Sequence, residues 1–435
     1  MRILLIYLFL LSGSTLFSQK KNIINNRVVE LATQLEQKTI AWRRDFHANP
    51  ELSNREFRTS AIIAKHLRSL GLDVDTGVAK TGVVAILKGA RPGPVVALRA
   101  DMDGLPVTER GNLEFASKIK STFNGQPVGV MHACGHDSHM AILMTVAELL
   151  TQMKGEINGT VKFIFQPAEE GPPVGEEGGA QLMVKEKVLS NPDVDVIFGL
   201  HIDALLEAGK INYRPGGFYA SVNDMKITVK GQSSHGAAPW NSIDPIVVSA
   251  QIINNLQTII SRNLNITEHP GVVTIGSIHG GNRSNIIPEQ VEMLGTVRSL
   301  SLDDEKFLKE RIITIVTKTA EAMGAEATIE IPHTIHYPVT FNDSSLTAKM
   351  LPTLQRSAGI ANVNLRVPKT GAEDFSFFQE KVPGLFFGLG GMPKGKTNPA
   401  DHHTPDFYLD ESGFRLGVIT MSNLVLDYMN KQPSK

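Results

Sequence analysis

The sequence predicts an α/β fold in which helices pack on a central, largely parallel sheet, with a second domain inserted into the first. In the outer parts of the chain, apolar runs of strand length alternate with amphipathic helical patterns, as in layered α/β proteins. In the middle the pattern changes to one that can fold on its own. The length of 435 residues leaves room for two or three domains.

The outer parts begin with helices. Residues 23–46 carry apolar side chains at three- and four-residue steps, interrupted at Thr39 and resumed at Trp42, which predicts an amphipathic helix. A second helix is expected over 59–70, ended by Gly71. The elements expected next are strands at 81–87, 95–100, 161–165 and 194–200, and a helix at 140–153. We expect the functional site in the segments that follow these strands, because α/β sheets bind ligands outside the carboxyl ends of their strands.

The middle of the chain follows the order β-α-β-β-α-β. The six elements are expected at 225–229, 244–262, 272–278, 290–297, 303–323 and 327–331. This order is the ferredoxin-like pattern. We therefore predict that 221–331 is an inserted domain, and that 19–220 and 332–435 form one discontinuous domain around it.

Residues 1–18 have the pattern of a secretory signal peptide. A positive start at Arg2 precedes an apolar run over 3–11, and small and polar residues follow up to Ser18. The run is shorter than the roughly 20 residues that a membrane-spanning helix needs, so no stable membrane span is expected. An N-terminal anchor and a buried helix are the alternatives. We expect export to the periplasm or the extracellular space.

Charge and cysteine content restrict the function further. The formal net charge is -1, so no basic excess exists to neutralise phosphates and no nucleic-acid partner is expected. Cys134 is the one cysteine of the sequence, so an exported chain has no internal disulfide. A lone thiol in an oxidising compartment must be buried or bound, which draws attention to Cys134.

Four segments concentrate side chains of metal-binding type: 132–139, 166–171, 199–201 and 401–405. Thiolate, imidazole and carboxylate together are a transition-metal ligand set, whereas magnesium or calcium would require oxygen ligands. A nucleophilic pair of Cys134 with a histidine is the alternative, but it would leave the remaining histidine and glutamate clusters without a role.

Spacing within these segments suggests a division of labour. Cys134 and His136 alternate by two, so in an extended loop both side chains can face the same side. Glu169 and Glu170 are consecutive, so one can bind metal while the other handles a proton. Each pair alone also has a structural explanation; it is their occurrence in one chain that favours a metal centre.

Seven segments together resemble the amidohydrolase branch of the aminoacylase/carboxypeptidase metallopeptidase family. This branch includes hippurate hydrolases, bacterial N-acyl-amino-acid hydrolases and plant auxin-conjugate hydrolases. The segments are 43–53, 98–106, 131–139, 167–180, 231–239, 282–288 and 371–375. They follow the order of the family from about residue 40 to the C-terminus, and linked motifs are far more specific than any one of them.

The resemblance implies a three-layer α/β/α catalytic domain with a mixed sheet and an inserted lid domain through which such proteins often dimerise. It implies two divalent transition-metal ions per subunit, zinc, manganese or cobalt. The ligands that it implies are Cys134, His136, Glu170, His201 and His403. Cys134 would bridge the metals. His403 is preferred to His402 because the family ligand stands two residues before a proline, here Pro405.

The resemblance also implies roles for residues that do not bind metal. Carboxypeptidase relatives have a histidine ligand where this chain has Asp101, so Asp101 need not be a ligand, and Asp103 is expected to orient a ligand imidazole. His235 is expected to hydrogen-bond the developing oxyanion, in cis or in trans across a dimer. The candidates for substrate binding are Asn285, Arg283 and Gly371.

The implied reaction is hydrolysis of the amide bond of an N-acyl amino acid, such as a hippurate-like substrate, with Glu169 as general base on a metal-bridging water. The products are a carboxylate and a free amino acid. A metallocarboxypeptidase or dipeptidase acting on short or N-capped peptides is the alternative within the hydrolases. A non-catalytic ligand-binding relative is the alternative from another class, but it would not need Glu169. The expected assembly is a homodimer through the inserted domain.

Overall fold

The structure of the protein is a computed structural model that describes residues 2–430, with side chains from residue 22 onward. The described chain divides into two compact units: Arg214–Asn342 and Arg366–Gln379 form unit 2, and the rest forms unit 1. The expected signal segment, 1–18, has side chains outside the described part of the chain. Among the described residues, no helix combines the length and the apolar character needed to cross a membrane.

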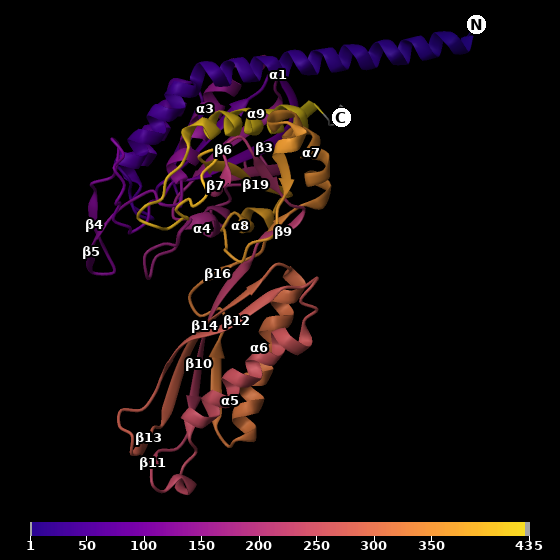
Figure 1. The fold of residues 1–435 in the computed structure, drawn as a ribbon. Helices are drawn as coiled ribbons and strands as arrows, with labels where there is room; N and C mark the ends of the chain where they lie inside the picture. The colour runs from indigo at the N-terminus through magenta and orange to yellow at the C-terminus, as the bar shows by residue number, and fades with distance from the viewer. Residues whose placement is uncertain (1, 431–435) are drawn as a thin grey trace. The chain divides into compact units, whose positions relative to one another are not determined.

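Unit 1 is built on a mixed sheet that has eight strands among the described residues (Figure 1). In spatial order these are β1 (Asp73–Val78), β2 (Gly82–Lys88), β6 (Asn158–Gln166), β3 (Arg91–Asp101), β7 (Val196–Glu207), β19 (Gly384–Met392), β8 (Ile211–Tyr213) and β18 (Val363–Leu365). The central strands β6, β3, β7 and β19 are parallel, and β1, β2 and β8 join antiparallel. The central strands are buried over most of their length, except at the start of β3 and the end of β7, as expected for parallel strands covered on both faces.

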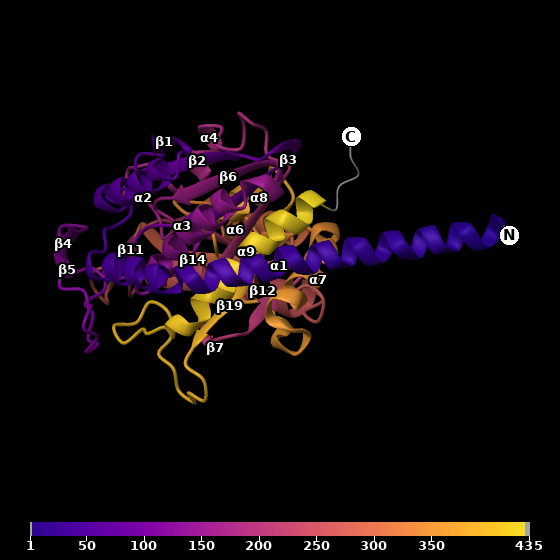
Figure 2. The same cartoon turned by 90° about the horizontal axis from the view of Figure 1, so that it is seen from above.

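Helices pack on both faces of this sheet. α1 (Arg2–Ala48), α3 (His136–Gln152) and α9 (Phe414–Asn430) lie together on one face, beside α7 (Ser344–Ala358) and α2 (Phe57–Ser69), as Figures 1 and 2 show. Thr39, which interrupts the apolar stripe of α1, is buried and lies 2.7 Å from the hydroxyl of Thr145 on α3. The interruption is therefore a paired polar contact within the helical layer, and the helix continues through it.

Strand β6 shows how one strand serves both faces. Phe163 and Phe165 pack into the core under the helices. Lys162 points the opposite way, because side chains alternate along a strand. Its buried Nζ donates to the carbonyl oxygens of Val188 and Ser190, beyond α4 (Gly179–Lys185). The predicted three-layer arrangement is confirmed. Unit 1 also contains the hairpin of β4 (Lys120–Phe123) and β5 (Gln126–Gly129).

Unit 2 follows the predicted β-α-β-β-α-β order. Its elements are β10 (Ser221–Lys230), α5 (Pro245–Thr258), β12 (Gly271–His279), β14 (Gln290–Ser299), α6 (Leu302–Ala322) and β15 (Glu326–Glu330). The strands form an antiparallel sheet in the order β12-β14-β10-β15. Both helices start at residues that cap them: the side chains of Asp244 and Ser301 accept backbone N–H groups of the first turn. The predicted fold class is thus confirmed for both units.

Shorter elements complete unit 2. They are β9 (Gly216–Tyr219) paired with β17 (Thr340–Asn342), β11 (Ser234–His235) paired with β13 (Ile286–Ile287), β16 (His336–Tyr337) paired with β10, and α8 (Ser376–Gln379). The segment 366–379 joins β9 through a bridge between Tyr219 and Lys369. Unit 2 therefore extends beyond the predicted 221–331 and includes Gly371.

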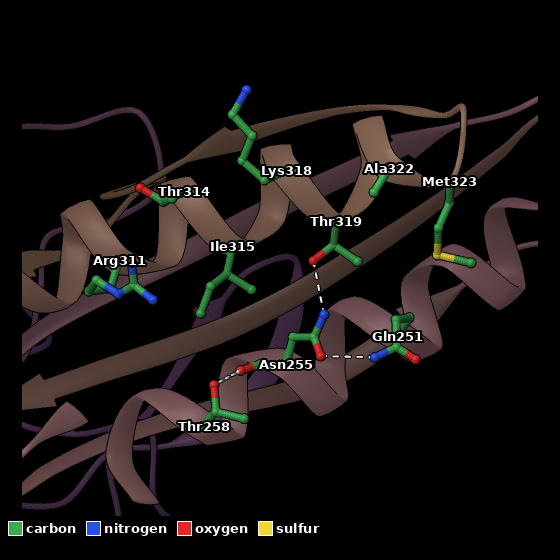
Figure 3. Close-up of a pocket in the computed structure, with 10 residues that line it drawn as sticks. All are labelled: Gln251, Asn255, Thr258, Arg311, Thr314, Ile315, Lys318, Thr319, Ala322 and Met323. Carbon is green, nitrogen blue, oxygen red and sulfur yellow. Dashed lines mark hydrogen bonds between the residues drawn. The ribbon is translucent and has the colours of Figure 1, made fainter. Parts of the chain in front are cut away.

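A hollow of about 490 Å³ lies between α5 and α6 (Figure 3). Asn255 crosses it, accepting from Gln251 and donating to Thr319. Its lining residues include no histidine, cysteine, aspartate or glutamate. The side chains expected to carry chemistry are therefore not in this hollow.

Candidate metal centre

The four segments predicted to carry the chemistry meet at the carboxyl edge of the parallel strands in unit 1. Asp101 at the end of β3 pairs with Gln166 at the end of β6, and Arg99 pairs with Gly199 of β7. His201 therefore stands level with Asp101. The 401–405 loop joins this edge because the backbone N–H of His403 donates to the carbonyl of Ala133 at 2.9 Å.

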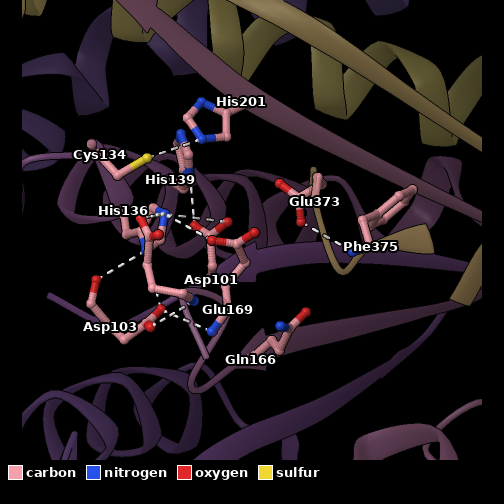
Figure 4. Close-up of polar contacts among 12 residues, drawn as sticks. Asp101, Asp103, Cys134, His136, His139, Gln166, Glu169, His201, Glu373 and Phe375 are labelled. Atoms are coloured by element: carbon pink, nitrogen blue, oxygen red, sulfur yellow. Dashed lines mark hydrogen bonds and ion pairs between the residues drawn. The ribbon is translucent and has the colours of Figure 1, made fainter. Parts of the chain in front are cut away.

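Cys134 points its Sγ towards His201 in the cluster (Figure 4). Its Sγ is 3.4 Å from Nε2 of His201 and 3.3 Å from Nε2 of His403. Nε2 of His403 is also 3.1 Å from Oε1 of Glu170. Gly135, with a φ of +93°, turns the chain between Cys134 and the start of α3 at His136. A residue with a side chain rarely adopts this left-handed conformation.

His136 faces the glutamates. Its Nε2 lies 3.7 Å from Oε2 of Glu169 and 3.9 Å from Oε1 of Glu170. Its Nδ1 donates to the backbone carbonyl of Asp103 at 2.9 Å and lies 3.2 Å from the Asp103 carboxylate. These contacts are those expected of a residue that orients a ligand imidazole.

The imidazole tautomers fit metal ligation. His201 donates Nδ1–H to the carbonyl of Ile202 at 2.6 Å, as His136 does to Asp103, so in both neutral rings Nε2 offers a lone pair. Nε2 of His136 is buried and has no hydrogen-bond partner among the described residues. A buried nitrogen without a partner, among thiol, imidazole and carboxylate groups, is what a site for divalent transition metals provides.

The adjacent histidines of the last segment differ in what their nitrogens do. Nε2 of His402 accepts the backbone N–H of Ala204 at 3.1 Å, so the neutral ring carries its proton on Nδ1, the nitrogen 3.8 Å from Cys134. His403 instead presents Nε2 to both Cys134 and Glu170. The geometry favours His403 as the ligand, in line with the position of Pro405.

The charge balance around the thiol calls for a cation. Burial raises the pKa of Cys134 well above its usual range, and the carboxylates of Glu170 and Glu169 raise it further. The thiolate, which is the form that binds metal, is therefore stable here only with positive charge beside it.

The neighbouring imidazole shows the same imbalance. Burial lowers the pKa of His136, but the carboxylates of Asp101 and Asp103 outweigh it and raise this pKa to about 10. In the absence of metal, a proton on His136 compensates part of the negative charge that the carboxylates bring together.

Two buried carboxylates accept hydrogen bonds from the backbone of the turn that carries Glu169 and Glu170. Asp103 accepts the backbone N–H of Glu169 at 3.1 Å and that of Glu170 at 3.0 Å. Glu56 accepts the N–H of Ala168, a residue with a φ of +52°, at 2.9 Å. The positions of both glutamate side chains thus depend on Asp103 and Glu56.

Glu56 was not among the residues that the sequence suggested. It is fully buried, and its other oxygen accepts the hydroxyl of Thr81 at 2.5 Å. It lies 112 positions from Ala168 in the chain, directly before an ordinary amphipathic helix. No local pattern distinguishes it from a surface glutamate.

Asp101 and His139 form a second pair beside the cluster. His139 donates Nδ1–H to Asp101 at 2.5 Å, and its Nε2 accepts the backbone N–H of Ile202 at 2.8 Å. The other oxygen of Asp101 accepts from Arg99 at 2.6 Å. Both oxygens of Asp101 are engaged, which agrees with the expectation that it need not be a ligand. Through His139, Asp101 restrains the backbone at Ile202, next to His201.

The remaining predicted residues belong to unit 2. His235 on β11 is paired in register with Ile286 on β13, close to Asn285, whose carbonyl accepts the N–H of Gly236. Arg283 lies on the same exposed ribbon. Gly371 lies elsewhere in unit 2, where its carbonyl accepts the N–H of Ala220. The roles predicted for these four residues stay predictions.

Fold and site together define the class of this protein, a metal-dependent hydrolase that acts on amide bonds. The predicted resemblance is confirmed by comparison with known families. Residues 97–427 match the peptidase family M20/M25/M40, and the chain belongs to this family.

Relatives of known name agree with this assignment. Thermostable carboxypeptidase 2 of Saccharolobus solfataricus is 39% identical over 399 residues, which cover 92% of this chain and 97% of that protein. N-acetylcysteine deacetylase of Bacillus subtilis is 38% identical over 374 residues, 86% of this chain and 92% of that protein. Among solved structures, the Bacillus subtilis YXEP protein, described as a dinuclear metal binding peptidase, is 33% identical and matches with a TM-score of 0.77 over 92% of this chain and 100% of that chain.

Proposed function

We propose that the protein hydrolyses N-acyl amino acids to a carboxylate and a free amino acid. The observation that carries the proposal is the pair of consecutive glutamates on one pinned turn. Both carboxylates lie near Nε2 of His136, and Glu170 also reaches Nε2 of His403, next to the thiol of Cys134. A binding protein would need ligands for the metal but no second carboxylate held in this way.

The chain offers ligands for two divalent ions on either side of Cys134. The groups that lie close enough to share an ion include Cys134 with His136 and His201, and Cys134 with Glu170 and His403. Because Cys134 belongs to both groups, we propose that its thiolate would be a ligand of both ions. When bound, such ions polarise the amide carbonyl and lower the pKa of a water towards neutrality. The ligand set suits zinc, and also manganese or cobalt.

In the proposed reaction Glu169 moves one proton twice. Its carboxylate accepts a proton from the attacking water as oxygen bonds to the amide carbon. It then donates this proton to the amine nitrogen while the C–N bond breaks. The products are a carboxylic acid and an amine, and the second proton of the water passes from the acid to the amine or to solvent, which leaves the carboxylate. Asp103 keeps the Glu169 backbone fixed throughout.

We propose that His235 donates a hydrogen bond to the developing oxyanion. Its Nδ1 accepts the N–H of Ala237 at 3.0 Å, so the neutral ring carries its proton on Nε2. This is the tautomer that a donor needs. Arg283 and Asn285, on the neighbouring strand segment, are proposed to contact the substrate.

A second candidate function is that of a carboxypeptidase or dipeptidase acting on short or N-capped peptides. The relative from Saccharolobus solfataricus carries the name of a carboxypeptidase, whereas the Bacillus subtilis relative carries that of a deacetylase. Both reactions break an amide bond and release a free amino acid, and the same metal centre would serve both. A panel of N-acyl amino acids and dipeptides, tested with zinc-loaded and manganese-loaded protein, decides between them.

The Glu169→Gln variant tests the proposed base. It should retain both metals and lose turnover by about 100- to 10,000-fold, because the amide cannot take the proton. Metal content by mass spectrometry and initial rates are the measurements. Glu177→Gln, which changes an exposed glutamate paired with Lys185, is the matched control and should keep full activity. Near-full activity of Glu169→Gln would remove the assignment.

Cys134→Ser tests the bridging thiolate. The serine hydroxyl does not ionise near neutral pH, so the variant should bind fewer than two ions, or bind them more weakly, in a metal titration. A variant that takes up two ions with unchanged affinity would contradict the bridge.

We also propose export of the protein and a homodimer formed through unit 2. The pattern of residues 1–18 supports export, and mass spectrometry of the protein recovered from its native compartment tests it through the position of the N-terminus. Strand β12 supports the dimer, because it ends the sheet of unit 2 with one side unpaired among the described residues. Light scattering gives the mass in solution, and a monomer at micromolar concentration would refute the dimer.

A further inference from the structure

Arg366 is a buried cation that lacks an acceptor. Its side chain is 5% exposed, and Nε and both terminal nitrogens are buried without a hydrogen-bond partner among the described residues. It follows β18 directly and belongs to unit 2. No sequence motif pointed to it.

Two aromatic rings hold the guanidinium in place. The central carbon of Arg366 lies 4.4 Å from the centroid of Phe218 and 4.6 Å from that of Tyr219, both on β9 or at its end. The rings attract the charge through the face of the guanidinium. They cannot take its N–H groups, which point outward in the guanidinium plane. The structure therefore stabilises the cation and leaves its donors free.

Free donors in a buried cation are costly unless an anion or ordered water takes them. Within the described chain no carboxylate forms an ion pair with Arg366. A second cation approaches instead: Nη1 of Arg214 donates to the backbone carbonyl of Arg366 at 3.2 Å. In the described part of the chain, the contacts of Arg366 thus include a second guanidinium but no carboxylate, which favours an anionic ligand over water alone.

A carboxylate is the anion that fits best. The planar fork of a guanidinium binds its two oxygens through parallel hydrogen bonds. Burial strengthens this pairing because water competes less for the donors. The previously predicted Arg283 is exposed and lacks this advantage.

We propose that Arg366, stacked on Phe218 and Tyr219, binds the carboxylate of a small-molecule ligand. This inference rests on the proposed function in one respect: the ligand is taken to be an N-acyl amino acid, whose amino-acid half carries a free carboxylate. Arg366 would then select acids over the corresponding amides. Its role is to bind the substrate and not to take part in proton transfer.

The test compares hippurate with its uncharged amide, hippuramide. Calorimetry on the full chain without metal measures binding in the absence of turnover. Hippurate should bind more tightly than hippuramide. Arg366→Met should lower the affinity for hippurate by about 10- to 100-fold and leave the affinity for hippuramide unchanged. Arg366→Lys keeps the charge but loses the planar fork of donors. Its affinity for hippurate should lie between those of the wild type and Arg366→Met. Arg262→Met, at an exposed arginine of the same unit, is the control.

Thermal melting separates a binding role from a structural one. Removing an unpaired buried cation should leave the melting temperature of Arg366→Met unchanged or higher. A lower melting temperature together with unchanged hippurate affinity would overturn the inference and make Arg366 a packing residue. Equal affinity of the wild type for hippurate and hippuramide would overturn it as well.

Kinetics on the metal-loaded enzyme distinguish this inference from the proposed function. If the wild type hydrolyses N-acyl amino acids but Arg366→Met keeps their KM, the inference fails and the function stands. If no N-acyl amino acid is hydrolysed while hippurate binding still depends on Arg366, the function fails and the carboxylate site stands.

Discussion

Replacing Glu56 by glutamine should stabilise the protein in a pH-dependent way. Glu56 is 0% exposed, and its carboxylate accepts from Ala168 and Thr81. Burial, followed by the charge of Asp103, raises its pKa from 4.5 to about 7. Glutamine has nearly the same shape, and its amide oxygen can still accept the Ala168 N–H, so Glu56→Gln removes the charge without removing the contact.

The magnitude follows from the two pKa values. One pKa unit corresponds to about 1.4 kcal/mol of free energy. The rise in the pKa of Glu56 from 4.5 to about 7 therefore corresponds to about 3 kcal/mol. A carboxyl with a raised pKa binds its proton more tightly in the folded state. Its favourable contribution is therefore complete below pH 4.5 and is lost as the pH rises to about 7. At pH 8 the ionised Glu56 destabilises the wild-type fold by the full amount. At pH 5 it does so by less than about 1 kcal/mol.

The assay is urea unfolding of the metal-free full chain at pH 5 and pH 8. The free energy of unfolding of Glu56→Gln should exceed that of the wild type by about 3 kcal/mol at pH 8 and by little at pH 5. Glu310→Gln, at an exposed glutamate of α6, should show no such pH dependence. A gain for Glu56→Gln that is equal at both pH values, or a loss at pH 8, would refute the reasoning, because the buried charge would then not be the cause.

Three further substitutions test the packing that supports the cluster. Gly135→Ala should destabilise the protein and reduce its metal content, because the new Cβ would lie 2.4 Å from Cγ2 of Ile202 at a φ of +93°; melting temperature and metal analysis measure this, and an unchanged metal content would contradict it. Arg43→Met should cost about 3–5 kcal/mol in urea unfolding, since it removes the guanidinium 3.0 Å from the buried Asp137 and leaves only the imidazole of His47, at 2.7 Å, beside that carboxylate; Asp137→Asn in the same chain should recover part of the loss. Lys162→Met should cost about 2 kcal/mol or more, because it strips the Val188, Ser190 and Pro192 carbonyls of a donor, and a neutral result would show that water replaces it.

The elements that were predicted well are those whose pattern is local. In unit 2 the predicted helix 303–323 is α6 (Leu302–Ala322), and the predicted strand 290–297 lies within β14 (Gln290–Ser299). Apolar periodicity decides these elements before any tertiary contact forms. The segments predicted to bind metal were found from their residue types, and two of them, 166–171 and 199–201, lie at the ends of predicted strands.

The features that were not predicted depend on contacts between distant parts of the chain. Strand β19 (Gly384–Met392) is rich in glycine, which weakens any strand signal, and its place between β7 and β8 is set by packing. Glu56 acts on Ala168, and Arg366 on the rings of β9, across separations that periodicity does not register. The limits of unit 2 were missed for the same reason, since 366–379 returns to it after a strand of unit 1.

Asp103 shows why the cluster is organised by its supporting residues as much as by its ligands. One carboxylate accepts the backbone N–H groups of Glu169 and Glu170, and the same residue accepts the Nδ1–H of His136. A shift of Asp103 would therefore move the proposed base and two proposed ligands together. Ser53 donates to this carboxylate at 2.7 Å and restrains it further. The sequence predicted Asp103 beside a ligand imidazole; the structure shows that Asp103 also accepts the backbone N–H groups of Glu169 and Glu170, which a pattern of residue types alone does not reveal.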